Sequence, residues 1–385
     1  MTHRLQILDV RALLKVSRPR SNKSSIIVTM QKGHAVDLRR VGSHPDFWYP
    51  LARANSVKRG RTLAVSFAGD PIVLVRCADG GVFALEDRCA HRQVPLSAGV
   101  VCGKALKCGY HGWTYDASGR CINVPYLSAD RERPNGVRGY PCREAYGLIF
   151  VFPGDPAKAP TVPFPDVPAA VDPEYKTRYL SRRINCHYSF LHENLMDMNH
   201  QFLHRSLMGG IHPTLLNSAR GSDCMEAVYK FDRISGGQSL GEKFMLGARA
   251  KGVNKREHDT MMIRTQYPYQ TLNFCRADKD KPALDLWLAY TPVDREQKVT
   301  HSFGLMNIQR PRIPGLINLA WPFIVFFTNG IFSQDQWIME EEQKAHDAQG
   351  ADWNQEVFPV IRSLREVLAS CGVAASYKTA NKASA

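Results

Sequence analysis

The chain has 385 residues, of which 44% are hydrophobic and 22% charged, and it contains ten cysteines. These values are typical of a globular protein of two or three domains, and they exclude a disordered chain, a polytopic membrane protein and a disulfide-rich scaffold. The formal net charge is +14, and half of this excess lies in residues 1–40, which hold nine Lys or Arg and two Asp residues. No basic stripe is interleaved with aromatic residues, so we expect no nucleic-acid partner.

We interpret residues 1–40 as a basic, flexible N-terminal extension. They lack the continuous apolar core of a secretory signal peptide. The Arg- and Ser-rich stretch 13–25 has the composition of an organelle transit peptide, so organelle targeting is left open. A basic tail is the simpler interpretation, and with it we expect a cytoplasmic protein.

The next two segments differ sharply in composition. Residues 41–152 contain short β-branched and aromatic runs separated by Gly-rich turns, which predicts a small antiparallel β domain. Residues 153–175 hold seven prolines. Such a density excludes regular helix and central strand, so we predict a stiff, extended linker between two domains.

Residues 176–373 predict a larger second domain of mixed structure. The segment 186–207 is typical of a helix, residues 225–310 of a sheet, and residues 331–370 of helices. Residues 374–385 are small and polar, which predicts a flexible tail. The fold class expected for the whole chain is therefore α+β, with a small antiparallel β domain followed by an antiparallel sheet with helices.

One stretch raises the question of a membrane. Residues 315–327 are almost entirely apolar, but they are too few for a span of ~20 residues and they include Pro322. We expect a buried helix or a pocket wall and no transmembrane span; a patch at a membrane interface is the alternative.

Four potential metal ligands lie in two short segments of the predicted β domain. One residue separates Cys89 from His91, two separate Cys108 from His111, and sixteen lie between the pairs. A zinc site can use two Cys and two His, but its usual spacing pairs like with like. Segments that each mix the two ligand types suit a binuclear cluster whose irons need different ligands, as in a Rieske [2Fe–2S] centre. We predict such a cluster, with zinc as the alternative.

A second candidate metal site follows the linker. On the predicted helix, Asp197, His200 and His204 stand at i, i+3 and i+7 and share one face. Two imidazoles one turn apart can bind one metal, and a distant carboxylate would complete the 2-His-1-carboxylate triad of non-haem Fe(II) oxygenases. Such pairs also occur by chance, so this prediction depends on the quartet upstream. Three other histidines are alternative ligands: His187, His192 and His212.

Both constellations resemble motifs of the Rieske non-haem iron oxygenases. The matching patterns are C-x-H-R at residues 89–92, C-x-Y-H-G-W at 108–113, and N-x2-D-x2-H-x3-H at 194–204, although many members have four residues between the last two histidines. The resemblance implies that Cys89 and Cys108 hold one iron of the cluster and that His91 and His111 hold the other. It also implies that His200 and His204 bind a mononuclear iron.

The third iron ligand is also assigned by resemblance. The D-x4-E pattern at 335–340 resembles the C-terminal helix of the vanillate and dicamba O-demethylases, which implies that Asp335 completes the triad. In this family Asp197 would bridge His200 and the partner subunit's His111 within a head-to-tail homotrimer. Asn194, one helical turn earlier, would support that bridge.

The resemblance implies an α-only terminal oxygenase component. It would consume O2 and take electrons from a separate ferredoxin or NAD(P)H-dependent flavin reductase, since the chain has no G-x-G-x-x-G loop in a strand–helix context. We expect hydroxylation or O- or N-demethylation, with cis-dihydroxylation and an electron-transfer protein without oxygenase activity as alternatives. The substrate is expected to be apolar, aromatic or polycyclic, because many aromatic and Met residues precede the carboxylate helix: Tyr267, Tyr269, Phe274, Trp287, Phe303, Met306, Trp321 and Phe323.

Overall fold

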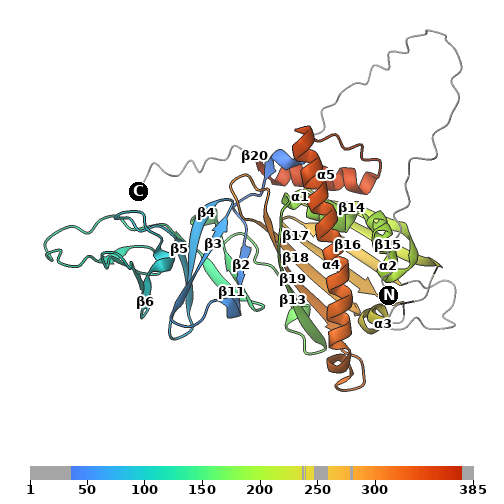
Figure 1. Ribbon diagram of the computed structural model, residues 1–385, viewed down its shortest axis with the longest axis horizontal. Helices are drawn as coiled ribbons and strands as arrows, with labels where there is room; N and C mark the ends of the chain where they lie inside the picture. Colours follow the sequence, from blue (N-terminus) through green and yellow to red (C-terminus); the bar gives the residue numbers. More distant parts are fainter. Residues whose placement is uncertain (1–35, 236–237, 239, 247–258, 278–280, 375–385) are drawn as a thin grey trace, which may run out of the picture. The chain divides into compact units, whose positions relative to one another are not determined.

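The computed structural model describes residues 36–235, 238, 240–246, 259–277 and 281–374. Residues 1–35 of the predicted extension and 375–385 of the predicted tail lie outside this description. From Asp37 onward the chain forms one compact unit of antiparallel sheets and helices (Figure 1). The predicted α+β class is confirmed.

The first half of the unit is built of short strands in three antiparallel sheets. Their orders are β10-β5-β4-β3, β11-β12-β2 and β6-β7-β8-β9. The strands are β2 (Tyr49–Arg53), β3 (Arg61–Phe67), β4 (Asp70–Arg76), β5 (Val82–Glu86), β6 (Val100–Cys102), β7 (Ala105–Lys107), β8 (Thr114–Tyr115), β9 (Cys121–Asn123), β10 (Gly139–Tyr140), β11 (Cys142–Ala145) and β12 (Leu148–Val151).

The local sequence explains these strands. The run Ile72–Val75 of β4 is almost fully buried, because one side of the strand packs toward the core near Cys89 and the other toward Tyr49. Strands β3 and β4 are joined by the two-residue turn Ala68-Gly69, where both residues have positive φ angles of 47° and 82°. This conformation matches the twist of a hairpin and favours glycine at its second position.

The second half is built on one seven-stranded antiparallel sheet of order β13-β19-β18-β17-β16-β15-β14. Its strands are β13 (Tyr175–Ile184), β14 (Gly210–Arg220), β15 (Cys224–Ser235), β16 (Thr260–Gln266), β17 (Tyr269–Cys275), β18 (Leu284–Pro292) and β19 (Thr300–Gln309). Its α-helices are α1 (Tyr188–Met196), α2 (Arg205–Met208), α3 (Leu240–Leu246), α4 (Leu316–Gln349) and α5 (Pro359–Cys371). Helix α4 crosses the face of the sheet in Figure 1, and its buried residues Ile324 and Phe327 share a core with the sheet.

The Pro-rich segment packs against both halves of the chain. It forms short 3-10 helices at Pro156–Lys158 and Pro168–Ala170, and Phe164 and Val167 join a core with Trp48 and Trp287. Hydroxyl groups from the large sheet also bond to the first half of the chain: Thr291 donates to the Pro50 carbonyl of β2 at 2.8 Å, and Tyr269 donates to the Trp48 carbonyl just before it at 2.6 Å. The segment predicted as a stiff, extended linker therefore also contributes to packing, because apolar side chains between its prolines are buried.

The predicted N-terminal boundary is also too late. Asp37 caps a 3-10 helix at Leu38–Arg40, and Leu38 and Arg39 are buried. Strand β1 (Val41–Gly42) then pairs with β20 (Val373–Ala374), so these residues belong to the second half and not to the first β domain. Composition alone predicts a tail here. The buried Leu38 side chain and the buried, paired Arg39 guanidinium nevertheless hold this segment against the fold.

The apolar stretch 315–327 is only half buried. It forms the first part of α4, whose inner residues include Ile317, Ile324 and Phe327, while Leu319 and Phe326 face outward. Helix α4 is the one helix in the described parts of the chain that is long and apolar enough to cross a membrane, and 28% of its most apolar window is buried. Because its inner face packs on the sheet, it lies along the domain surface.

Candidate active site

Two loops bring the four Rieske-type residues together at one end of the first half. The loop after β5 carries Cys89 and His91, and the β7–β8 loop carries Cys108 and His111. Both cysteines are buried at 2% exposure, whereas both histidines are exposed. The imidazole rings of His91 and His111 lie 4.6 Å apart between centroids.

Each loop turns tightly on its own main chain. The Gln93 amide donates to the Cys89 carbonyl, and the Gly112 amide to the Cys108 carbonyl. Gly112 has a φ of 71°, a conformation that side chains disfavour. The Tyr115 hydroxyl lies 3.2 Å from the Cys89 sulfur. Two inner thiols and two outer imidazoles are the donor set that a Rieske cluster requires.

The environment of the loops supports the same assignment. Burial raises the pKa of the Cys108 thiol, so in this apolar setting only a bound cation would favour the thiolate. The His91 ring stacks on Trp113 with an interplanar angle of 4° and a centroid distance of 4.7 Å. Trp113, from the Gly-Trp end of the motif, therefore holds one outer imidazole in place.

The second site differs from the predicted continuous helix. Helix α1 ends at Asp197, whose φ and ψ are −82° and 94°, and a 3-10 helix follows at Met198–Phe202. The Asp197 carboxylate accepts from the Asn199 amide at 2.9 Å and so caps the new helix. Aspartate is a weak helix former and a strong N-cap, which explains the break. The shared helical face predicted for Asp197, His200 and His204 is thus wrong.

The break nonetheless brings His200 and His204 to Asp335 of α4. His204 Nε2 lies 3.2 Å and His200 Nε2 3.9 Å from Asp335 Oδ1. Ligand atoms of all three residues lie within 4.8 Å of one another. Two imidazoles and one carboxylate at these distances can hold one octahedral metal on a single face and leave other positions open.

Both imidazoles are held in the tautomer that a metal requires. His200 Nδ1 lies 2.5 Å from the main-chain carbonyl of Asp197, and His204 Nδ1 lies 2.8 Å from Oε1 of Gln334. Because both partners are acceptors, each Nδ1 carries the proton and each Nε2 is left as a lone-pair donor. His204 Nε2 is buried and makes no hydrogen bond of normal geometry to the described residues, as expected of a metal ligand.

The charges of the triad also fit a cation. Burial lowers the pKa of His200, so it stays neutral. Burial opposes ionisation of Asp335, but the neighbouring His204 and His200 outweigh it and lower the pKa of the carboxyl. Burial likewise opposes protonation of His204, yet the Asp335 carboxylate raises its pKa. A carboxylate and two imidazoles in a buried site form the donor set of a divalent iron centre.

Asn194 and Asp197 lie beside the triad, and each makes a hydrogen bond to one of its members. Asn194 Nδ2 donates to Asp335 Oδ1 at 3.1 Å, so it orients the carboxylate that is predicted to bind iron. His200 meets the carbonyl of Asp197, while the carboxylate accepts from Asn199. Asp197 also lines a second hollow with His200, and His200 is the one residue, in the described parts of the chain, that this hollow shares with the pocket below.

The alternative ligands do not join the triad. His187 is a buried helix cap, His192 is buried against Tyr290, and His212 is exposed on β14. The residue missed from the sequence is Gln334, because nothing in its spacing marks it as the partner of His204.

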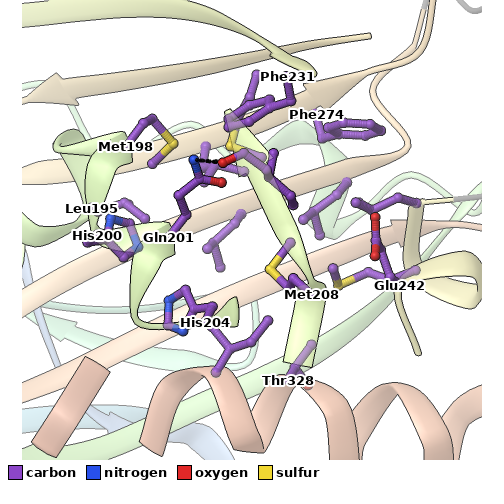
Figure 2. Close-up of a pocket in the computed structure, with 18 of the residues that line it drawn as sticks. Leu195, Met198, His200, Gln201, His204, Met208, Phe231, Glu242, Phe274 and Thr328 are labelled. Atoms are coloured by element: carbon purple, nitrogen blue, oxygen red, sulfur yellow. Dashed lines mark hydrogen bonds between the residues drawn. The ribbon is translucent and has the colours of Figure 1, made fainter. Parts of the chain in front are cut away.

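A pocket opens on the triad and is walled by apolar side chains. Figure 2 shows His200 and His204 at one side of it and Glu242 at the other. Its polar members besides the triad are Gln201, Arg233, Gln238, Glu242, Asp259 and Thr328. The other lining residues are apolar and five of them are methionines: Leu195, Met198, Met208, Ile211, Phe231, Met245, Leu246, Met261, Leu272, Phe274, Leu284, Leu286, Met306, Ile331 and Phe332.

Most of the aromatic residues expected to form this wall lie elsewhere. Phe274 and Met306 line the pocket. Trp287, Phe303 and Tyr269 instead belong to or pack on the core shared with the Pro-rich segment. Alternation along a strand sends neighbouring side chains to opposite faces of the sheet, which separates these two groups.

Comparison with known proteins places both sites in one family. Residues 47–141 match the Rieske [2Fe-2S] domain, and residues 184–360 match the vanillate O-demethylase oxygenase C-terminal domain. The chain is 32% identical over 346 residues to a 4beta-methylsterol monooxygenase of Methylococcus capsulatus, covering 86% of this chain and 89% of that protein.

Further similarities agree with this assignment. The dicamba O-demethylase oxygenase component of Stenotrophomonas maltophilia is 38% identical over 153 residues, or 40% of this chain. The fold matches a crystal structure of dicamba monooxygenase bound to dicamba with a TM-score of 0.67 and 24% identity, over 87% of this chain and 98% of that one. The chain therefore belongs to the Rieske non-haem iron oxygenases, which carry a [2Fe–2S] cluster and a mononuclear iron and consume O2.

Proposed function

We propose that the protein is a terminal monooxygenase that hydroxylates an apolar, polycyclic small molecule at a carbon held against His200, His204 and Asp335. The observation that carries this proposal is the Met-rich apolar pocket that opens directly on these three residues. Methionine side chains are flexible and polarisable, and they can fit a bulky, weakly functionalised ligand. Two of the charged lining residues, Arg233 and Glu242, form an ion pair with each other, so their charges are balanced within the protein.

The reaction would insert one oxygen atom of O2 into a C–H bond. Two electrons and two protons would reduce the other oxygen atom to water. The mononuclear iron would supply the oxygen chemistry, and the cluster would supply electrons. The residues of the chain would position these parts: Gln334 and the Asp197 carbonyl fix the two imidazoles, Asn194 fixes Asp335, and the apolar wall excludes water.

A methyl-bearing sterol is the substrate class we favour. The support is the similarity to the 4beta-methylsterol monooxygenase along most of both chains, together with the apolar character of the pocket. The test is incubation of the reduced, iron-loaded protein with a 4-methylsterol under 18O2. We expect one labelled oxygen atom in the product and none with His200→Ala. A product with two labelled oxygens on adjacent carbons would instead indicate cis-dihydroxylation.

We further propose that the working form is a homotrimer in the cytoplasm, reduced by a separate ferredoxin or flavin reductase. The support is the hollow lined by Asp197, His200, Phe202 and Glu342, which meets the substrate pocket at His200. The Asp197 Oδ2 atom has no hydrogen-bond partner among the described residues, so it could accept from the partner subunit's His111. Because the Asp197 carbonyl holds His200, this residue would join the two imidazoles through its side chain and its main chain.

Asp197→Asn tests this route for electrons. Asparagine keeps the shape of the side chain, and the main-chain carbonyl of residue 197, which holds His200, is unchanged. We therefore expect both metal centres to remain at full occupancy. Reduction of the cluster by a chemical reductant should proceed as in the wild type, but turnover should fall by about 10- to 100-fold. Wild-type turnover in the variant would exclude Asp197 from electron transfer.

An electron-transfer protein without oxygenase activity is the alternative of another class. Iron and acid-labile sulfide analysis separates the two. The oxygenase should contain about three irons and two sulfides per chain, and His200→Ala should lose one iron and no sulfide. About two irons in the wild type, unchanged after addition of Fe(II), would favour the electron carrier.

A further inference from the structure

The outer face of the first half of α4 carries large apolar side chains that the described parts of the chain leave exposed. Leu319 is 74% exposed, Phe326 80% and Phe323 54%. Their spacing of four and three residues places them on one side of the helix. They form a ridge on the surface, and we call it the α4 ridge.

Basic side chains border this ridge. Lys176, Arg178 and Arg182 project from the same face of β13, the edge strand of the sheet, and reach the flank of α4. Lys176 Nζ lies 2.6 Å from the Asn318 amide oxygen and 4.2 Å from the centre of the Trp321 ring. Arg310 and Arg312 are exposed in the segment before the helix.

These cations lack acidic partners. Arg178 and Arg182 share the amide oxygen of Asn329, at 2.7 and 3.0 Å, and neither forms an ion pair with the described residues. Burial and the nearby Arg182 lower the pKa of Arg178, and burial and Arg310 lower that of Lys176. Like charges held together without a carboxylate are unfavourable unless an anion binds beside them.

We propose that the α4 ridge and the basic residues beside it dock the protein on the surface of an anionic lipid bilayer. A helix with an outward apolar face and cations along its edge is the arrangement that lies in the plane of a membrane interface. The apolar side chains would enter the acyl boundary, and Lys176, Arg178 and Arg182 would meet lipid phosphates.

Two other occupants fit less well. The partner subunit proposed above would meet the opposite end of α4, where Ile338 and Glu342 line the hollow beside Asp197. Ile338 lies twelve residues beyond Phe326, or about 18 Å along the helix. An acidic redox protein would satisfy the basic residues but would not require a ridge of exposed Leu and Phe.

The ridge lies on the same helix as part of the substrate pocket, and the link between docking and substrate entry rests on the proposed function. The inner face of the same helix supplies Thr328, Ile331 and Phe332 to the substrate pocket. Helix α3 packs on α4 at Phe327 and adds Met245 and Leu246 to the pocket wall. A membrane-dissolved apolar substrate would therefore start on the other side of one helix from the iron site.

Vesicle flotation tests the docking without any turnover. The iron-loaded protein is mixed with vesicles of phosphatidylcholine alone or of phosphatidylcholine with phosphatidylglycerol. We expect the wild type to float with the anionic vesicles and to be released as salt screens the charges. The double variant Leu319→Ser/Phe326→Ser should lose about tenfold or more of the bound fraction. Arg178→Gln/Arg182→Gln should abolish the preference for the anionic lipid.

A matched control removes exposed leucines elsewhere. Leu215→Ser/Leu216→Ser changes β14, at the opposite edge of the sheet from β13, and should float as the wild type does. Wild type that stays in solution with both vesicle types would overturn the proposal. So would a ridge variant that floats normally but changes the oligomeric state by light scattering, or slows reduction of the cluster by an acidic ferredoxin. Absence of sterol oxidation with intact vesicle binding would overturn only the proposed reaction.

Discussion

Arg39 offers a sharp test of how the N-terminal segment is held to the catalytic half. Its side chain is 2% exposed, and its Nη2 lies 2.6 Å from Glu193 Oε2. It also donates to the Ser189 hydroxyl and lies 3.4 Å above the centre of the Phe190 ring. Arg39→Met would keep an apolar side chain and remove the charge, its hydrogen bonds and the cation–π contact with Phe190.

The expected cost follows from these contacts. Removing one partner of a buried ion pair costs about 3–5 kcal/mol, because the remaining charge stays buried. Glu193 keeps a second guanidinium, Arg365, at 2.5 Å. We therefore expect the lower end of the range, about 3 kcal/mol in the free energy of unfolding of the catalytic half. The midpoint of its thermal transition should fall by roughly 6 °C.

The neighbouring residue provides the control. Arg40 has a side chain that is 70% exposed, and its ion pair with Asp37 is at the surface. Arg40→Met should change the unfolding free energy by less than about 0.5 kcal/mol. Urea denaturation of both variants, followed by tryptophan fluorescence, measures the difference. If Arg39→Met lies within 0.5 kcal/mol of Arg40→Met, the burial of this segment does not stabilise the fold as we argue.

Three further changes probe the site and its surroundings. Gln334→Leu removes the acceptor of His204 Nδ1 and should weaken Fe(II) binding about 10- to 100-fold in a metal titration. Gln336→Leu, two residues further along α4, should not, because Gln336 bonds to Glu340. Met261→Trp should fill the pocket and raise the KM for a sterol about tenfold with unchanged iron content. Burial lowers the pKa of His192 from 6.5 to about 3, so below pH 6.5 the unfolded state binds a proton that the folded state does not. This group should cost about 1.4 kcal/mol of stability per pH unit as the pH falls from 6.5 toward 3, and His192→Gln should show a shallower loss in urea titrations at pH 7.5 and 5.5; an equal slope in both proteins would contradict that origin.

The sequence predicts local chemistry better than long-range contacts. Two tight loops hold Cys89, His91, Cys108 and His111, and the spacing of these residues is enough to predict the ligands of the cluster. Asp335 was assigned by resemblance, and the fold brings it to histidines more than 130 residues earlier. Gln334 could not be found this way, because a glutamine on a helix has no distinctive pattern until the fold places His204 beside it.

Composition misleads where a few contacts outweigh the average character of a segment. The tail assigned to residues 1–40 ends in Leu38 and Arg39, which are buried because Glu193 and Phe190 are available to pair and stack with the arginine. The apolar stretch 315–327 reads as buried, yet a helix on the surface of a sheet has only one inner face. Hydrophobicity fixes the helix but not which of its residues the rest of the chain covers.

The break at Asp197 explains how one short segment can serve both sides of the iron site. In a continuous helix the Asp197 carbonyl would accept from the amide of Gln201, four residues later. The 3-10 turn instead bonds it to the His200 amide at 3.1 Å and leaves it open to His200 Nδ1. His200 Nε2 can then face Asp335 and the substrate pocket, while Asp197 faces the hollow behind. In a continuous helix the Asp197 carbonyl would be used by the main chain and the imidazole would lose this partner, so the residue that breaks the helix is the one that orients His200, the proposed iron ligand.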